Sequence, residues 1–235
     1  MAGRQNSKPA SAMEAPAARS IASPWAHPPS REELRASKRE AVLRTAAQIF
    51  NEKGFHATSL DEVAERLQVT KPTLYYYVKN KGEILFECVT IGLQMMEDAI
   101  QRERALGGSA IDQLGAAMRS YVDIVTQDFG MCIIRVGEDP LPPESRKELR
   151  RFKAKLDRHF RELVQRGIEE ESIVACDPKI AAFTIAGALS WVGRWYRPGG
   201  DLTPEEIAEQ CITVLMRGLA RPRPARGVKA STRPR

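Results

Sequence analysis

The chain has 235 residues, of which 43% are hydrophobic and 28% charged, and its formal net charge is +6. This length is enough for one medium domain or two small domains that bury a core. No apolar run reaches the ~18 residues of a membrane span, and residues 1–6 lack the apolar segment of a signal peptide. We therefore expect a cytoplasmic protein with no membrane partner.

The positive charge is concentrated at one end. Residues 221–235 carry six Lys or Arg side chains and no acidic one, so the rest of the chain is close to neutral. Bulk charge of this kind supports only nonspecific attraction to nucleic acid. Any argument for DNA binding must therefore rest on where particular side chains lie.

Both ends of the chain predict disorder. Residues 1–29 are rich in Ala, Pro and Ser, and residues 221–235 are rich in Pro and Arg, with no apolar periodicity in either stretch. Such segments cannot bury enough surface to offset the entropy of ordering. We expect two disordered tails, the second of them basic, around a folded region.

The first part of the folded region predicts three helices. Residues 30–33 form a capping box that opens a long helix, and Gly54 supplies the positive φ that ends it. Residues 59–62 form a second capping box at the start of a short helix. After a turn at residues 68–70, Thr70 caps a third helix over residues 71–77, in which Pro72 occupies the first turn.

The rest of the folded region is predicted to be helical as well. Asn80 caps a fourth helix that runs to about residue 104, and further helices are expected near residues 110–128, 142–170, 178–197 and 203–219. No alternating strand pairs joined by hairpin turns occur. The fold class predicted from these patterns is all-α.

Residue types with catalytic or metal-binding chemistry are sparse. The four cysteines lie far apart with no C-x-x-C spacing, which favours small buried hydrophobes in a reduced protein: Cys88, Cys132, Cys176 and Cys211. Only three histidines are present, and no nucleophile motif or phosphate-binding glycine loop occurs. We expect no catalytic residues, no metal and no cofactor, and thus no enzyme.

Two short helices joined by a three-residue turn are the physical parts of a helix-turn-helix. Residues 37–81, about a fifth of the chain, resemble the DNA-binding domain of the TetR family, and four stretches carry the resemblance: residues 46–55, residues 58–59, residues 63–64 and residues 69–81. One departure is Gln68, where the family most often has Gly. A positive φ at this position costs about 1 kcal/mol, which weakens the turn without forbidding it.

The resemblance implies a TetR-like regulator with two domains. These are an N-terminal three-helix helix-turn-helix domain at residues 30–80 and a C-terminal helical domain at residues 81–220 that binds an effector and forms a homodimer. The implied partners are a double-stranded, palindromic DNA operator and a small molecule, with repression as the family default. The alternative is a helical interaction protein that does not bind DNA.

The candidate DNA-binding residues lie on and around the third predicted helix. Lys71 can donate to guanine, and Pro72 and the Thr73 methyl group can contact a thymine methyl group. By resemblance, four residues bind phosphate: Tyr75, Tyr77, Lys81 and Thr58. Three adjacent tyrosines point in three directions, so not all of them are buried, whereas Leu74 and Val78 belong to the core. The full set is Thr58, Thr70, Lys71, Pro72, Thr73, Tyr75, Tyr76, Tyr77 and Lys81.

The last two predicted helices are apolar and rich in small residues, which lets helices approach closely. By resemblance they form the dimer interface, and the alternative is ordinary core of one subunit. We favour the dimer, because a single DNA-binding head seldom supplies enough specific affinity. The candidate interface residues are Ala182, Ile185, Ala186, Leu189, Ile207, Cys211, Val214 and Leu215.

An apolar effector pocket is also implied, although each of its candidate residues could be ordinary core. The candidates are Met118, Tyr121, Val122, Val125, Phe129, Phe160, Trp191, Arg194 and Trp195. Residues 191–200 resemble a segment of TetR regulators of fatty-acid and steroid catabolism, some of which respond to acyl-CoA thioesters. A basic run could bind CoA phosphates or simply face solvent: Arg146, Lys147, Arg150, Arg151, Lys153, Lys155 and Arg158.

Overall fold

The computed structural model describes residues 30–219, and the predicted tails lie outside the described residues. Within that range the chain forms helices and no strand, so the predicted all-α class is confirmed. The helices are α1 (Arg31–Lys53), α2 (Leu60–Arg66), α3 (Lys71–Tyr77), α4 (Lys81–Leu106), α5 (Ala110–Thr126), α6 (Asp128–Val136), α7 (Pro143–Glu169), α8 (Pro178–Trp195) and α9 (Pro204–Leu219).

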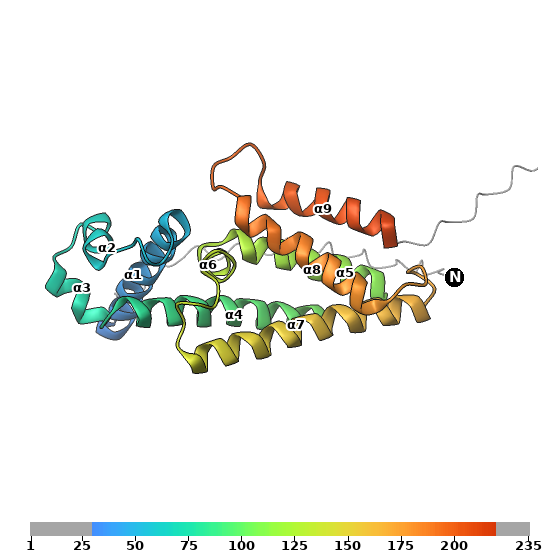
Figure 1. Cartoon of the computed structure of the whole chain (residues 1–235), viewed down its shortest axis with the longest axis horizontal. Helices are drawn as coiled ribbons and strands as arrows, with labels where there is room; N and C mark the ends of the chain where they lie inside the picture. The colour runs from blue at the N-terminus through green and yellow to red at the C-terminus, as the bar shows by residue number, and fades with distance from the viewer. Residues whose placement is uncertain (1–29, 220–235) are drawn as a thin grey trace, which may run out of the picture.

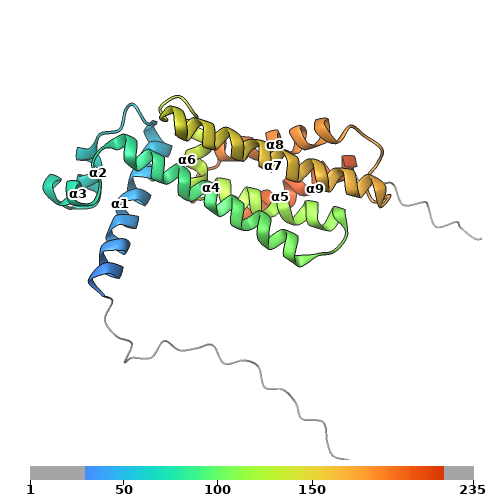
Figure 2. The same ribbon diagram turned by 90° about the horizontal axis from the view of Figure 1, so that it is seen from below.

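The helices form a small head and a larger body (Figure 1). The head consists of α1, α2 and α3 at one end of an elongated molecule, and the body consists of α5 to α9. Helix α4 begins in the head and runs along the body beside α7, as both views show (Figure 2). Because one continuous helix joins the two parts, any movement of α4 also moves the head.

Each part has its own hydrophobic core. The head core buries Phe50, Leu74 and Val78 together with the start of α4 and much of α6. The body core is formed by α5, α7, α8, α9 and the second half of α4. No helix within residues 30–219 is both long and apolar enough to cross a membrane.

The predicted helix starts are largely confirmed by their caps. The Ser30 hydroxyl accepts from the Glu33 N–H and the Glu33 carboxylate accepts from the Ser30 N–H, which completes the capping box. The second box is only half present, and the prediction is corrected there. Ser59 caps α2, but the Glu62 carboxylate pairs with Lys53 instead of returning to the Ser59 N–H.

Helix α6 is the element that sequence patterns did not predict. The expected helix at 110–128 ends at Thr126, and a separate nine-residue helix follows after a turn at Gln127. A Cβ atom at Gly130 would lie 2.0 Å from the Ile124 carbonyl oxygen, so only glycine permits this approach of α6 to α5. A glycine inside a short apolar segment argues against a helix locally, and the packing overrides that preference.

The cysteines divide by burial, which corrects the expectation that all four are buried. Cys88 and Cys132 have no exposed surface, Cys211 is half-buried and Cys176 is exposed. Burial raises the pKa of the Cys132 thiol to about 12 and also raises the pKa values of Cys88 and Cys211. Burial therefore protects these cysteines in two ways: it blocks access to the sulfur, and it disfavours the thiolate, which is the reactive form.

We predict that a thiol-specific reagent at neutral pH modifies Cys176 first and Cys211 more slowly. Cys88 and Cys132 should react only after denaturation. Mass spectrometry of the modified peptides against time measures this order, and a Cys176→Ser variant should lose the fast phase. Rapid modification of Cys132 in the folded protein would contradict the packing of α6.

Candidate DNA-binding site and its connection to the body

The turn between α2 and α3 has the geometry of a helix-turn-helix. Gln68 adopts a φ of 55°, so this non-glycine residue occupies the left-handed conformation expected at its position. The Val69 N–H donates to the Ala64 carbonyl at 3.0 Å, and the Thr70 hydroxyl caps α3 by accepting from the Thr73 N–H. The first bond fixes the turn to the end of α2 and the second fixes the start of α3, despite the unfavourable backbone conformation at Gln68.

Helix α3 presents one face to the core and the other to solvent. Leu74 and Val78 are buried, as predicted, whereas Tyr75 and Tyr76 are 52% and 64% exposed. The first turn, residues 71–73, is exposed as well. The Arg35 guanidinium lies 5.3 Å from the centre of the Tyr76 ring, which restrains that ring. The exposed first turn and tyrosines fit a helix whose N-terminal half enters a major groove.

Lys71 has a competing partner in the free protein. Its ammonium nitrogen lies 2.6 Å from an Asp61 carboxylate oxygen, and both side chains are 59% exposed. The hydrogen bond to Asp61 raises the pKa of Lys71, so the ammonium stays charged. An ion pair this exposed contributes little to stability, because solvent screens it, and it can be exchanged for a base contact.

Thr58 does not have the predicted role. Its side chain is only 3% exposed, and its hydroxyl donates to the Gly54 carbonyl oxygen at 2.8 Å. The hydroxyl therefore closes the loop between α1 and α2 and is not available to a phosphate.

Lys81 is the second correction. Its ammonium nitrogen donates to the carbonyl oxygens of Phe55 at 2.8 Å, Thr58 at 2.9 Å and His56 at 3.3 Å. It also lies 4.5 Å from the centre of the Phe55 ring. An ammonium has three N–H donors, and all three are engaged here. Lys81 thus fixes the α1–α2 loop to the first residue of α4 and positions the head, where resemblance had placed a phosphate contact.

The predicted dimer residues differ in their exposure. Ala182, Ile185, Leu189 and Ile207 are buried in the core of their own subunit, so they are not available to a partner. Ala186, Cys211 and Leu215 are half-buried, and Val214 is 72% exposed. The prediction chose the face of α8 with small residues, and that face points into the core. Spacing alone does not say which side of an apolar helix faces outward.

The outward face of α8 carries large apolar side chains that the prediction omitted or assigned elsewhere. Ile180, Phe183, Trp191 and Trp195 are all exposed, the third of them by 64%. Their spacing of three, eight and four residues places them along one side of the helix. An exposed apolar stripe of this size is unusual for the surface of a single subunit.

The predicted effector pocket is only partly assembled. Five of its residues belong to the body core: Met118, Tyr121, Val122, Val125 and Phe160. Tyr121 and Phe160 line a cavity of about 10 Å³ between α4, α5 and α7, which is room for one water molecule.

Four predicted pocket residues lie elsewhere. Phe129 is in the head core, with the Arg44 guanidinium 5.2 Å from its ring centre. Trp191, Arg194 and Trp195 are on the outer face of α8. Those four assignments were wrong, because an aromatic residue near an expected ligand can face either side of its helix.

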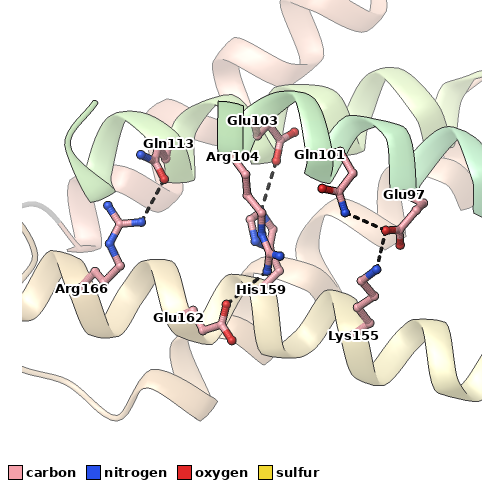
Figure 3. Close-up of polar contacts among 9 residues, drawn as sticks. All are labelled: Glu97, Gln101, Glu103, Arg104, Gln113, Lys155, His159, Glu162 and Arg166. Atoms are coloured by element: carbon pink, nitrogen blue, oxygen red, sulfur yellow. Dashed lines mark hydrogen bonds and ion pairs between the residues drawn. The ribbon is translucent and has the colours of Figure 1, made fainter. Parts of the chain in front are cut away.

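Sequence reasoning missed a polar pair beside the cavity. His159 on α7 and Glu103 on α4 are both buried, and the His159 Nε2 and Glu103 Oε2 atoms lie 3.3 Å apart (Figure 3). Both side chains line the cavity, and the Tyr121 hydroxyl is hydrogen-bonded to the Ser190 hydroxyl at 2.7 Å. Buried polar groups in an apolar pocket are suited to orient a ligand. The two residues are far apart in the chain, so no sequence motif indicated that they form a pair.

Helix α6 connects the body to α1 at both of its ends. At its start, the Asn51 side-chain amide donates to the Asp128 carbonyl oxygen at 2.9 Å. At its end, the Arg135 guanidinium donates to the carbonyl oxygens of Asn51, Gly193 and Tyr196 at 2.9, 2.8 and 2.5 Å. One side chain therefore joins the last turn of α1 to the end of α8.

A short helix with an exposed first turn, held by a tight turn against a second helix, defines a helix-turn-helix DNA-binding protein. Residues 42–88 match the family described as "Bacterial regulatory proteins, tetR family", and residues 107–219 match "Tetracyclin repressor-like, C-terminal domain". The chain belongs to the TetR family of transcriptional regulators. It is a DNA-binding regulator and not an enzyme, and the alternative of an interaction protein that does not bind DNA is not favoured.

Individual relatives support the assignment along most of the chain. The HTH-type transcriptional repressor KstR2 of Rhodococcus jostii is 24% identical over 196 residues, covering 80% of this chain and 94% of the relative. A TetR/AcrR-family regulator from Thermobifida fusca is 30% identical, with 79% and 100% coverage and a TM-score of 0.56. AibR, solved with isovaleryl coenzyme A and operator DNA, is 27% identical, with 76% and 98% coverage and a TM-score of 0.66.

We predict that Lys81→Met lowers the free energy of unfolding by about 1–3 kcal/mol, because it leaves three loop carbonyls without their donor. Urea denaturation followed by circular dichroism measures this. Lys79→Met is the matched control: Lys79 is exposed two residues away, and its loss should change stability by less than about 0.5 kcal/mol. Unchanged stability in Lys81→Met, with a smaller salt dependence of DNA binding, would restore the phosphate-contact interpretation.

Proposed function

We propose that the protein is a cytoplasmic, ligand-responsive repressor that binds a palindromic operator as a homodimer. The observation that carries this proposal is the exposed first turn of α3, where Lys71, Pro72 and Thr73 are accessible to base edges. The names of the repressor KstR2 and of the operator-bound AibR support repression and operator binding. A regulator of chromosomal DNA acts in the cytoplasm.

The roles of the head residues follow from their positions. Thr70 and residues 71–73 are proposed to read bases, with Lys71 leaving Asp61 on binding. Tyr75 and Tyr76, which extend from the outer face of α3, are proposed to contact the phosphate backbone, with the half-buried Tyr77 next to them. Phosphate contacts set the register, and base contacts set the sequence preference.

The dimer is proposed to form through the outer faces of α8 and α9. This surface combines the exposed stripe of α8 with outward residues of α9: Ile180, Phe183, Ala186, Trp191, Trp195, Cys211, Val214 and Leu215. A two-fold pairing of this face would bury the large apolar side chains and present two heads to two half-sites.

The effector is proposed to be a CoA thioester that acts on α4 from the body. AibR was solved with such a ligand, and the body has a small cavity between α4, α5 and α7 that a ligand would have to widen. Widening displaces α4 relative to α6, and these helices support the head from two sides. With the proposed domain division at residues 30–80 and 81–220, the moving helix α4 begins at the boundary. A ligand shifts the equilibrium between the unwidened and the widened body only to the extent that it binds the widened state more tightly.

We predict that a gel shift with the DNA upstream of the protein's own gene shows retention that survives moderate salt. Lys71→Ala should weaken this complex by about 1–3 kcal/mol and relax the preference at one base pair. Arg102→Ala, which removes an exposed charge from the second half of α4 in the body, is the control and should bind normally. Equal affinity of the wild type for random DNA would refute the proposal.

We also predict that Trp191→Glu converts the dimer to a monomer, because a charge would replace a central apolar contact. Analytical ultracentrifugation measures the mass, and the same variant should lose cooperative operator binding. Leu34→Glu makes the same change at an exposed leucine of α1 and should remain dimeric. A dimeric Trp191→Glu variant would show that another surface forms the interface.

A further inference from the structure

The basic run on α7 separates into paired and unpaired side chains. Arg150 and Lys153 both bind the Glu138 carboxylate, at 2.8 and 2.7 Å. Lys155 pairs with Glu97 on α4. Among residues 30–219, no ion pair or hydrogen bond engages the side chains of three further cations of the run: Lys147, Arg151 and Arg158. The paired cations therefore fit the interpretation of a solvent-facing run, and the unpaired ones fit the interpretation of phosphate binding.

The unpaired cations share one face of the helix. At 100° per residue, positions 147, 151 and 158 fall within about 40° of one another. All three line a groove between α4 and α7, whose two adjoining stretches share Glu148 and Arg151 and have volumes of about 560 and 600 Å³. Each stretch alone is in the size range of a ligand site, ~300–1,000 Å³.

The charge is uneven along the groove. In the stretch near the start of α7, Lys147 and Arg151 face the carboxylates of Glu144 and Glu148. The second stretch has three cations, Arg151, Lys155 and Arg158, against two carboxylates, Glu97 and Glu148, and Glu97 is already paired with Lys155. The apolar side chains of Leu93 and Phe152 line it as well. The second stretch therefore has an excess of positive charge beside an apolar surface.

The spacing of the two arginines suits a ligand with separated phosphates. Arg151 and Arg158 are seven residues apart, which is about 10 Å along the helix axis. A planar guanidinium binds phosphate through two parallel N–H donors and also stacks on flat rings. A nucleotide with phosphates at two positions could engage both arginines while its base covers the apolar side chains.

The groove adjoins the internal cavity. Glu97 and Lys155 line the groove, and their neighbours Met96 and Leu156 line the cavity. Figure 3 shows the row of contacts that closes this seam between α4 and α7, in which the Glu97–Lys155 pair is followed by Glu103–His159 and Arg104–Glu162. A phosphate beside Lys155 would compete with Glu97 for the ammonium and weaken the seam at its first contact.

We propose that the α4–α7 groove binds the phosphate-bearing nucleotide of a CoA thioester through Arg151 and Arg158, while the acyl end enters the cavity past Glu97 and Lys155. This inference rests on the proposed effector class and adds the site that recognises it. The ligand would separate α4 from α7, and α4 carries the head.

The test is isothermal titration of the full-length protein with free coenzyme A, pantetheine and ATP. Coenzyme A should bind, and pantetheine, which lacks the nucleotide, should bind at least roughly tenfold more weakly. Arg151→Gln/Arg158→Gln should weaken coenzyme A binding by at least roughly tenfold, because two charge-assisted contacts are lost. The matched control is Arg150→Gln/Lys153→Gln, which removes the same charge from the same helix outside the second stretch and should bind normally.

The outcomes separate this proposal from the proposed function. If Arg151→Gln/Arg158→Gln, with a thermal midpoint like that of the wild type, binds coenzyme A normally, the groove assignment is wrong even if isovaleryl-CoA still releases the operator. ATP binding as tight as that of coenzyme A would also overturn it, because the groove would then be a general polyanion site. If neither coenzyme A nor isovaleryl-CoA binds the wild type, the groove and the effector class both fail, whereas repressor function is judged by the gel shift alone.

Discussion

The placement of the head depends on the close approach of α6 to α5 at Gly130. Any side chain there would collide with the Ile124 carbonyl, so a single residue without a Cβ decides whether α6 can lie against the body. Once in place, α6 contacts α1 through both of its ends, and α1 carries the two helices of the helix-turn-helix. A constraint inside the body therefore sets the orientation of side chains on the far side of the head.

The head has a second attachment, and its chemistry differs from the first. Helix α6 contacts α1 by packing and by several hydrogen bonds, whereas α4 is joined to the α1–α2 loop by the ammonium of Lys81. Because Lys81 is the first residue of α4, the α1–α2 loop that it binds moves together with that helix. A displacement of α4 against a fixed α6 would tilt the head, which is the movement that a ligand-controlled repressor requires.

Sequence reasoning predicted the elements that are determined locally. Ser30, Thr70, Asn80 and Thr203 mark helix starts because a capping side chain acts on backbone only two or three residues away. It failed where long-range packing decides. Helix α6 exists because of Gly130 and its neighbour α5, and the outward face of α8 is defined only after its inward face has found a core.

The individual site residues show the same division. The exposed face of α3 could be predicted, because Leu74 and Val78 fix the rotation of a seven-residue helix. Thr58 and Lys81 could not, since each has two chemically reasonable partners, and only the folded loop shows that its own carbonyls are nearer than any phosphate. Family resemblance assigned both to DNA because it carries over a residue type without its local hydrogen bonds.

Arg135 links α8, which has the exposed apolar stripe, to α1 of the head. The carbonyls it binds are in the last turn of α1 and at the end of α8, where no backbone donor follows within the helix. Desolvation lowers the pKa of its guanidinium, as do the nearby charges of Arg197 and Arg194, yet three carbonyl acceptors hold it in place. If α8 pairs with its copy, the distance between the two heads is set at this contact, and a ligand that moves α4 works against it. The separation of the heads is then a balance between a dimer-side contact at Arg135 and a ligand-side contact along α4.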